Sequence, residues 1–140
     1  MAATYQVECT FCDIPDDKKL IENELAFCIL DIHPLTPGHS LIVPKRHFTD
    51  YFDMNRSELG AIDDLTHIHR KQLLETYPSI RGFNVGINSG RAAGQTIFHT
   101  HIHLIPRREG DTEDPRGGVR GVIPGRMGYG KGKSEKKKGW

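Results

Sequence analysis

The spacing of apolar residues divides the chain into short runs typical of strands and one longer helical stretch. Residues 25–31 and 39–44 are two apolar runs separated by a turn rich in proline and glycine, which predicts an antiparallel hairpin. Two further runs, at residues 84–88 and 97–105, predict a third and a fourth strand. Because only one helix interrupts these strands, the pattern indicates an α+β fold with a mainly antiparallel sheet.

The helical stretch lies between residues 57 and 77. Its apolar residues recur every three or four positions and are Leu59, Ile62, Leu65, Ile68 and Leu73. Ser57 is placed to cap this helix, and Pro78 is placed to stop it. His67 and His69 lie two positions apart and do not share a face, so we expect both at the surface or at a subunit contact.

A change of composition near residue 110 divides the chain into three parts. Residues 1–110 have the apolar patterning of one folded domain. Residues 111–130 form an extension rich in glycine and arginine, and residues 131–140 hold five lysines and almost nothing apolar. We expect the last part to be a flexible basic tail. Within the extension, residues 114–121 are expected to form a surface loop or, alternatively, to lie across the functional site and contact substrate.

The overall composition argues against several classes of function. The 140 residues carry a net charge of +1, so the chain as a whole is not a polyanion binder and a nucleic-acid partner is not expected. No apolar run approaches the length of about 18 residues that a membrane-spanning helix needs. The first residues lack the pattern of a secretory signal, which predicts a cytoplasmic protein. The odd number of cysteines, three, does not indicate a disulfide framework.

The strongest chemical signal is a row of three histidines in the predicted fourth strand. His99, His101 and His103 alternate with Thr100 and Ile102. Alternate residues of a strand share one face, so three imidazoles would gather within about 13 Å, at roughly 3.3 Å per residue. Core packing is a poor explanation, because the opposite face already supplies apolar contacts. Two functions fit such a row: a metal site, or one nucleophilic histidine with two supporting ones.

The residues just before this row favour nucleophilic chemistry on a phosphate. Gly94, Gln95 and Thr96 combine a glycine loop, an amide and a hydroxyl. Backbone N–H groups in such loops form concavities that bind anions, and the two side chains add neutral donors. An imidazole can attack phosphorus near neutral pH, because a useful share of it is unprotonated there.

These motifs resemble the histidine triad (HIT) family, whose signature is His-φ-His-φ-His-φ-φ with φ apolar. The signature matches residues 99–105, with Thr100 at the first apolar position, and the likeness extends upstream through residues 30–34 and 38–47. It covers roughly residues 9–108. The resemblance implies a HIT-like α+β fold, with a mainly antiparallel sheet of about five strands, one long helix and a short helix. It also implies a homodimer in which the two sheets join.

The resemblance implies a role for each residue of the site. His101 would attack the α-phosphorus and form a nucleotidyl-histidine intermediate, which water then hydrolyses. His103 would contact the phosphate and assist the leaving group, and His39 would lie beside both. Asp31 would accept hydrogen bonds from the ribose hydroxyls. The phosphate and leaving group would be held by Asn88, Gly94, Gln95 and Thr96. Alternatively, Asp31 and Asn88 are turn residues without a binding role.

The pair Cys9 and Cys12 has half of the spacing of a zinc site. Alone, the pair could equally be two buried thiols. Some members of the family complete a tetrahedral site with two histidines, and the matching positions here are His47 and His99. A set of two cysteines and two histidines has no open position, so the resemblance implies a structural zinc ion. It implies no catalytic metal.

The predicted function is that of a nucleotide hydrolase or nucleotidyl transferase that cleaves at the α-phosphate of an adenine nucleotide. Residues 106–111 resemble the dinucleoside polyphosphate hydrolase branch of the family, so a substrate such as diadenosine tetraphosphate is favoured. One alternative is a nucleoside phosphoramidase that hydrolyses AMP amides. Others are a metal-dependent enzyme and a nucleotide-binding regulatory protein without turnover, although a pure binder would have no need of His101.

Overall fold

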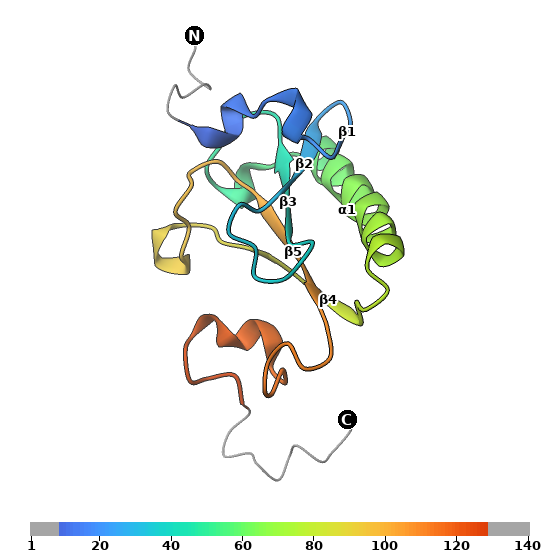
Figure 1. The fold of residues 1–140 in the computed structure, drawn as a ribbon. Coiled ribbons are helices and arrows are strands. Elements are labelled where there is room, and N and C mark those ends of the chain that lie inside the picture. Colours follow the sequence, from blue (N-terminus) through green and yellow to red (C-terminus); the bar gives the residue numbers. More distant parts are fainter. Residues whose placement is uncertain (1–8, 129–140) are drawn as a thin grey trace.

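The computed structural model describes residues 9–128, and its centre is a five-stranded antiparallel sheet (Figure 1). The strand order is β1-β2-β3-β5-β4, so β5 lies inside the sheet and β4 at an edge. The strands are β1 (Ile21–Glu22), β2 (Ala26–Leu30), β3 (Ser40–Pro44), β4 (Gly82–Ile87) and β5 (Ile102–Arg107). The predicted α+β class, sheet and hairpin are therefore confirmed.

One face of the sheet is covered by the long helix α1 (Arg56–Thr76). Its cap is Asn55, whose side chain accepts from the N–H of Glu58 while the Glu58 carboxylate accepts from the N–H of Asn55. The prediction of Ser57 as the cap was wrong, because Asn55, two residues earlier, makes a reciprocal pair with Glu58. The helix packs on inward side chains of the three central strands, Ala26, Cys28, Ile42, Ile102 and Leu104.

His69 corrects a second expectation about the helix. Its side chain is buried against the sheet, and its Nε2 lies 2.8 Å from Oγ of Ser40 on β3. His67 is exposed, and its Nδ1 lies within hydrogen-bond distance of the carbonyl oxygen of Asp63, one turn earlier in the same helix. The two positions therefore differ: only His67 lies at the surface.

The opposite face of the sheet carries a second apolar cluster. Its buried members are Phe11, Phe27, Ile29, Leu41 and Val43, with Cys9, Ile14 and Ile97 packed against them. The N-terminal segment, with the 3-10 turns η1 (Thr10–Asp13) and η2 (Asp16–Lys18), therefore covers one end of this face. His39, His101 and His103 lie on the uncovered part of the same face.

The predicted fourth strand begins later than its apolar pattern suggested. Residues 97–101 are not in a ladder, and β5 starts at Ile102, so of the three histidines only His103 lies in the strand. The backbone before Ile102 is held instead by other contacts: Thr100 donates from N to the Phe48 carbonyl and from Oγ1 to the Thr49 carbonyl. The prediction of one continuous strand over residues 97–105 was wrong in its first half.

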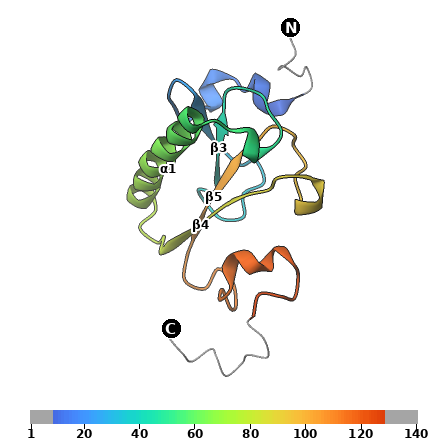
Figure 2. The ribbon, with the colours of Figure 1, turned by 180° about the vertical axis from the view of Figure 1, so that it is seen from behind.

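The remaining short segments are 3-10 turns and not one short α-helix. Besides η1 and η2, they are η3 (Tyr51–Asp53), η4 (Arg91–Ala93) and η5 (Gly118–Val122). Both ribbon views place η5 beyond β4, well away from α1 (Figure 2). The predicted lysine tail lies outside the described residues. Among residues 9–128, no helix has the length and apolar content needed to cross a bilayer.

Candidate active site

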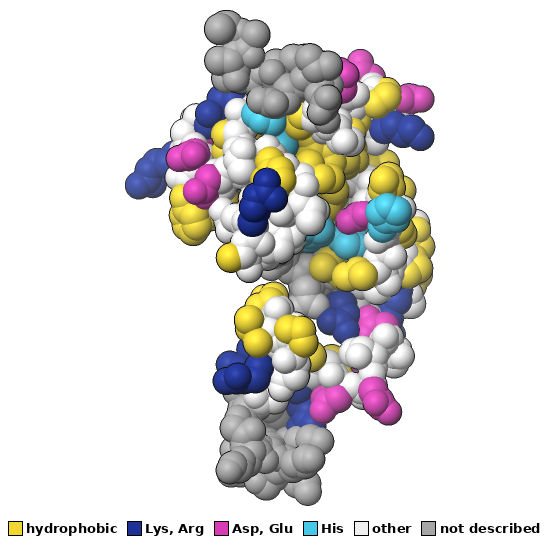
Figure 3. All heavy atoms as spheres, turned by 90° about the vertical axis from the view of Figure 1, so that its left-hand side faces the viewer, with side chains coloured by type: hydrophobic (Ala, Val, Ile, Leu, Met, Phe, Trp, Pro, Cys, Tyr) yellow, Lys and Arg dark blue, Asp and Glu magenta, His cyan; other side chains and the backbone are white. Residues whose placement is uncertain are grey.

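A pocket of about 900 Å³ lies on the face of the sheet opposite α1. It runs from the N-terminal segment and the end of β2, across β5 and β4, to η5. In the space-filling view, histidine side chains lie at a hollow with apolar side chains on both sides of it (Figure 3). Six of the predicted site residues line the pocket: Asp31, His39, Asn88, Thr96, His101 and His103.

His101 is buried at the floor of this pocket, just before β5. Its Nδ1 lies 2.8 Å from the carbonyl oxygen of His99, so Nδ1 carries the proton and donates it to that carbonyl. The unprotonated nitrogen is then Nε2. The ring of Phe11 packs edge-on against the imidazole, with centroids 5.0 Å apart. Burial lowers the pKa of His101 and so favours the neutral form of the imidazole. The backbone hydrogen bond and the Asp31 carboxylate partly offset this effect.

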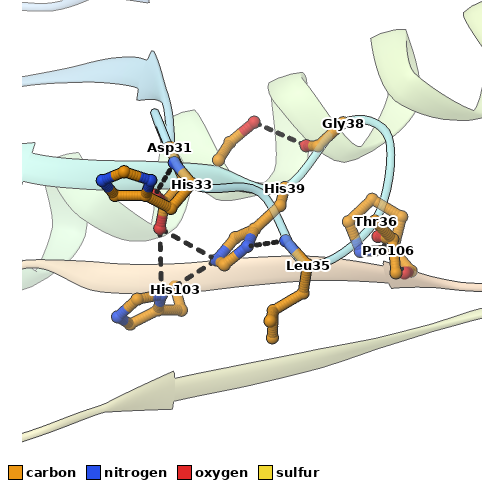
Figure 4. A network of polar contacts seen from close by, with 9 residues as sticks. Asp31, His33, Leu35, Thr36, Gly38, His39, His103 and Pro106 are labelled. Atoms are coloured by element: carbon orange, nitrogen blue, oxygen red, sulfur yellow. Dashed lines mark hydrogen bonds and ion pairs between the residues drawn. The ribbon is translucent and has the colours of Figure 1, made fainter.

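His39 and His103 form a chain of hydrogen bonds that begins at the backbone (Figure 4). The N–H of Leu35 donates to Nδ1 of His39 at 3.0 Å, so neutral His39 carries its proton on Nε2. That Nε2 lies 2.9 Å from Nδ1 of His103 and donates to it. His103 must therefore carry its own proton on Nε2. Since His101 and His103 have ring centroids 5.3 Å apart, an imidazole N–H donor and the unprotonated Nε2 of a second imidazole lie side by side.

Burial keeps this chain of imidazoles uncharged. It is the main cause that lowers the pKa of His103 to about 4, and the neighbouring His101 and His39 lower it further. Burial also lowers the pKa of His39, against an opposing effect of the Asp31 carboxylate. At neutral pH these side chains act as fixed dipoles and not as cations.

Asp31 follows β2 and lies beside both imidazoles. Its Oδ1 accepts from the N–H of His33 at 2.8 Å, which closes a tight turn. Its Oδ2 lies 3.4 Å from Nε2 of His39 and 3.9 Å from Nδ1 of His103. Asp31, His39 and His103 are also close enough together to hold a metal ion, which is the arrangement that a metal-dependent enzyme would need.

The glycine loop before the triad divides into residues that face the pocket and residues that support the loop. Asn88 and Thr96 line the pocket, whereas Gly94 and Gln95 do not. The buried amide of Gln95 accepts from the N–H of Gly90 and donates to the carbonyls of Thr49 and Ile97. Gly94 has a φ of 95°, a left-handed conformation that favours glycine. A direct phosphate contact of Gly94 or Gln95 stays a prediction.

His99 faces away from the pocket and toward the two cysteines of the N-terminal segment. Cys9, Cys12, His47 and His99 bring four ligand atoms together, all within 4.8 Å of one another. Nδ1 of His47 lies 3.1 Å from Nδ1 of His99, and Cys12 Sγ lies 3.2 Å from the former and 3.7 Å from the latter. A tetrahedral zinc ion with bonds of about 2.3 Å to sulfur and 2.0 Å to nitrogen would need edges of roughly 3.3–3.8 Å.

The contacts around His99 also suit a metal ligand. Its Nε2 donates to the carbonyl of Pro44 at 2.8 Å, which leaves the lone pair of Nδ1 directed at the cysteines. Burial is the main cause that lowers the pKa of His99 to about 4, so the ring is neutral, as a ligand must be. The four residues therefore fit a structural zinc ion. The three histidines are thus divided between two sites: His99 lies with the cysteines, whereas His101 and His103 line the pocket. The Phe11 ring lies between the sites and packs against both His99 and His101.

Some residues that form the pocket could not be identified from the sequence pattern. Phe11 was recognisable only as the residue between two cysteines of one motif, and its place against His101 is a tertiary contact. The N–H of Leu35 carried no signal, since backbone donors are not visible in a pattern of side chains. Asn84 on β4 and the apolar side chains of η5 also line the pocket. For residues 114–121 the sequence left open a surface loop and a segment lying across the site.

A comparison with known protein families shows to which family the chain belongs. The HIT domain matches residues 14–110, which include β1 to β5 and the whole histidine row. The chain belongs to the HIT family.

Two characterised relatives act on different compounds. Adenylylsulfatase HINT3 of Arabidopsis thaliana is 40% identical over 114 residues, which cover 79% of this chain and 57% of that protein. This chain therefore corresponds to little more than half of that relative. Adenosine 5'-monophosphoramidase HNT1 of Saccharomyces cerevisiae is 36% identical over 112 residues, covering 76% of this chain and 67% of that protein.

Solved structures of the family confirm the fold. A zinc-bound histidine triad protein from Mycobacterium smegmatis superposes with a TM-score of 0.67 at 36% identity, covering 76% of this chain and 80% of that one. The diadenosine triphosphate hydrolase of Plasmodium falciparum superposes with a TM-score of 0.66 at 28% identity, covering 72% and 68%. HIT proteins of this fold therefore include a zinc-bound protein and a nucleotide hydrolase.

Proposed function

We propose that this HIT protein is a nucleotide hydrolase or nucleotidyl transferase that uses His101 as a covalent nucleophile. The observation that carries the proposal is the hydrogen bond from Nδ1 of His101 to the His99 carbonyl. It leaves the Nε2 lone pair as the reactive atom of a neutral imidazole in a pocket of suitable size. A regulatory protein that only binds nucleotides would not need this arrangement.

In the proposed reaction, Nε2 of His101 attacks the α-phosphorus, so a P–N bond forms and the bond to the leaving group breaks. Nε2–H of His103 is the nearest donor on the chain of imidazoles and hydrogen-bonds the departing atom, which leaves with the electron pair of the broken bond. Water then attacks the nucleotidyl-histidine, so that the P–N bond breaks, a nucleoside monophosphate is released and the His101 ring is restored. Neutral donors of Asn88 and Thr96 hold the nonbridging oxygens, while the loop supported by Gly94 and Gln95 positions them.

Asp31 is proposed to hold the ribose. Its turn leaves Oδ2 on the pocket side, beside His39 and His103. The base would then lie on the apolar surface formed by Phe11, Ile14 and Ile29, which line the same end of the pocket. This arrangement suits a nucleotide whose α-phosphate reaches β5.

Dinucleoside polyphosphates such as diadenosine tetraphosphate are the favoured substrates. The support is the extent of the pocket, which continues past the histidines to η5, and the likeness to a diadenosine triphosphate hydrolase. A nucleoside phosphoramidase is the second candidate, favoured by the likeness to the yeast monophosphoramidase. We also propose a structural zinc ion on Cys9, Cys12, His47 and His99, and a homodimer.

The decisive experiment is a rapid acid and alkaline quench of protein mixed with α-³²P-labelled diadenosine tetraphosphate or an adenosine phosphoramidate. An alkali-stable, acid-labile label on the parent protein, absent from His101→Asn, is expected. Loss of a nucleophile should reduce turnover by several orders of magnitude while nucleotide binding persists. A variant that keeps more than a few per cent of the activity would refute the role of His101. Brief chelation should leave turnover unchanged, whereas immediate loss would favour a metal-dependent reaction.

A further inference from the structure

The end of the pocket farthest from the N-terminal segment is closed by η5. Gly118, Val119, Gly121 and Val122 all line the pocket. Both valine side chains are also largely exposed, at 65% for Val119 and 74% for Val122. Two neighbouring, mostly exposed apolar side chains at the mouth of a pocket are unusual for a plain surface loop, and they offer contact area to a bound molecule.

The shape of this segment is set by local contacts. Gly117 has a φ of 92°, and a side chain there would collide with the backbone of Met127. A side chain at Gly121 would meet the Met127 side chain at about 3.0 Å. The N–H of Arg120 donates to the Gly117 carbonyl at 2.8 Å. Because Met127 lies against the two glycines, η5 is supported from one side and presents Val119 and Val122 on another.

The order of strands places η5 on the leaving-group side of the proposed reaction. Asp31 follows β2, His101 lies just before β5 with His103 inside that strand, and η5 contacts β4 beyond them. With strands about 4.8 Å apart, β2 and β4 are separated by roughly 14 Å. A nucleoside held at Asp31 with its α-phosphate at His101 therefore directs its leaving group over β4, past Asn84, toward η5.

We propose that Val119 and Val122 form a subsite for the second nucleoside of a dinucleoside polyphosphate. The inference rests on the proposed function and deepens it by naming what the leaving group must contain. A sulfate or an amine is too short to reach η5 and has no apolar surface to offer. A purine or pyrimidine at the end of a polyphosphate has both the reach and a flat face that packs on valine side chains.

The test compares two substrates that share the adenylyl group and differ in the leaving group. In the full chain, Val119→Ser with Val122→Ser should lower kcat/KM for diadenosine tetraphosphate roughly ten- to hundredfold, the effect of removing methyl groups from an apolar subsite. The same variant should leave kcat/KM for adenosine 5'-phosphoramidate unchanged. Ile123→Ser is the matched control, since Ile123 is exposed on the same segment but does not line the pocket. It should affect neither substrate.

The outcomes separate this inference from the proposed function. An equal loss with both substrates, or no loss with either, would overturn the subsite. A change in sedimentation mass in the valine variant would also overturn it, because the two side chains would then be a subunit contact. If the parent protein forms no labelled His101 with either substrate, the proposed function itself fails, whatever the valine variant does.

Discussion

The most informative perturbation beyond the nucleophile is Asp31→Ala, because the structure limits what this carboxylate can bind. A carboxylate offers about four acceptor positions. One is taken by the His33 N–H at 2.8 Å, and the nearest imidazole nitrogen is 3.4 Å from Oδ2, too far for a strong bond. Acceptors therefore remain for the two hydroxyls of a ribose. Only 16% of the Asp31 side chain is exposed, so those bonds would be partly shielded from water.

The expected magnitude follows from this count. A hydrogen bond to a charged group contributes about 1.5–3 kcal/mol, which corresponds to roughly ten- to hundredfold in affinity. Asp31→Ala should weaken AMP binding by that factor, and 2′,3′-dideoxy-AMP should bind the unmodified Asp31 protein correspondingly worse. Applied together, the two changes should cost little more than either alone, since both delete the same contact. Titration calorimetry in the His101→Asn background measures binding without turnover.

Asp31→Asn provides the matched control for a purely structural role. Its amide oxygen can still accept from the His33 N–H, so the turn is kept while the charge is lost. We expect Asp31→Asn to lose most of the selectivity for ribose at little cost in thermal stability. Equal affinity of the Asp31 protein for AMP and its dideoxy analogue would show that the carboxylate only closes a turn, and the ribose role would have to be abandoned.

Three further predictions concern zinc, backbone strain and pH. Protein purified without chelator should contain zinc, and Cys9→Ser with Cys12→Ser should abolish it and lower the melting temperature by about 10 °C. That value assumes a loss of about 2.7 kcal/mol at roughly 4 °C per kcal/mol, and metal analysis with calorimetry decides it. Gly38→Ala should destabilise the fold by about 1–2 kcal/mol, because φ is 95° and the new methyl would lie 3.0 Å from Leu73. Gly60→Ala, on the open side of α1, should instead stabilise the fold by about 0.5–1 kcal/mol. Denaturant titration measures both changes. The hydrogen bonds from Arg46 lower the pKa of Glu58, so this carboxylate stabilises the fold above the ordinary value of 4.5 and loses that effect as pH falls through its lower folded value. The stability difference between the parent and Glu58→Gln should therefore shrink as pH drops below 4.5, and a constant difference would contradict the pairing.

Elements that depend on local pattern were predictable from the sequence. The apolar runs of β2 and β3 with a proline and glycine turn between them predicted the hairpin. Of the predicted helical stripe, Ile62, Leu65 and Leu73 form the buried face of α1, whereas the prediction was wrong for Leu59 and Ile68, which are exposed. Period-based reasoning failed where tertiary contacts replace a ladder. Residues 97–101 have a strand-like alternation, yet their backbone bonds go to Phe48 and to side chains, and the strand begins only at Ile102.

The site was less predictable than the fold, for a related reason. Composition and spacing located the histidines, but not which of them share a pocket. His99 differs from His101 because Pro44 and the two cysteines lie on its side of Phe11, which is information held in distant segments. The burial of His69 and the placement of η5 likewise depend on contacts with Ser40 and β4 that no local pattern contains.

The position of Phe11 has a thermodynamic consequence. This residue lies between the two cysteines of the proposed zinc site, and its ring packs on His101 at the wall of the proposed nucleotide pocket. Any rearrangement of the N-terminal segment on metal loss would therefore alter the surface that a base contacts. By linkage, if loss of zinc weakens nucleotide binding by some factor, a bound nucleotide strengthens metal binding by the same factor. In a cell, the fraction of protein carrying zinc would then follow nucleotide concentration as well as metal supply.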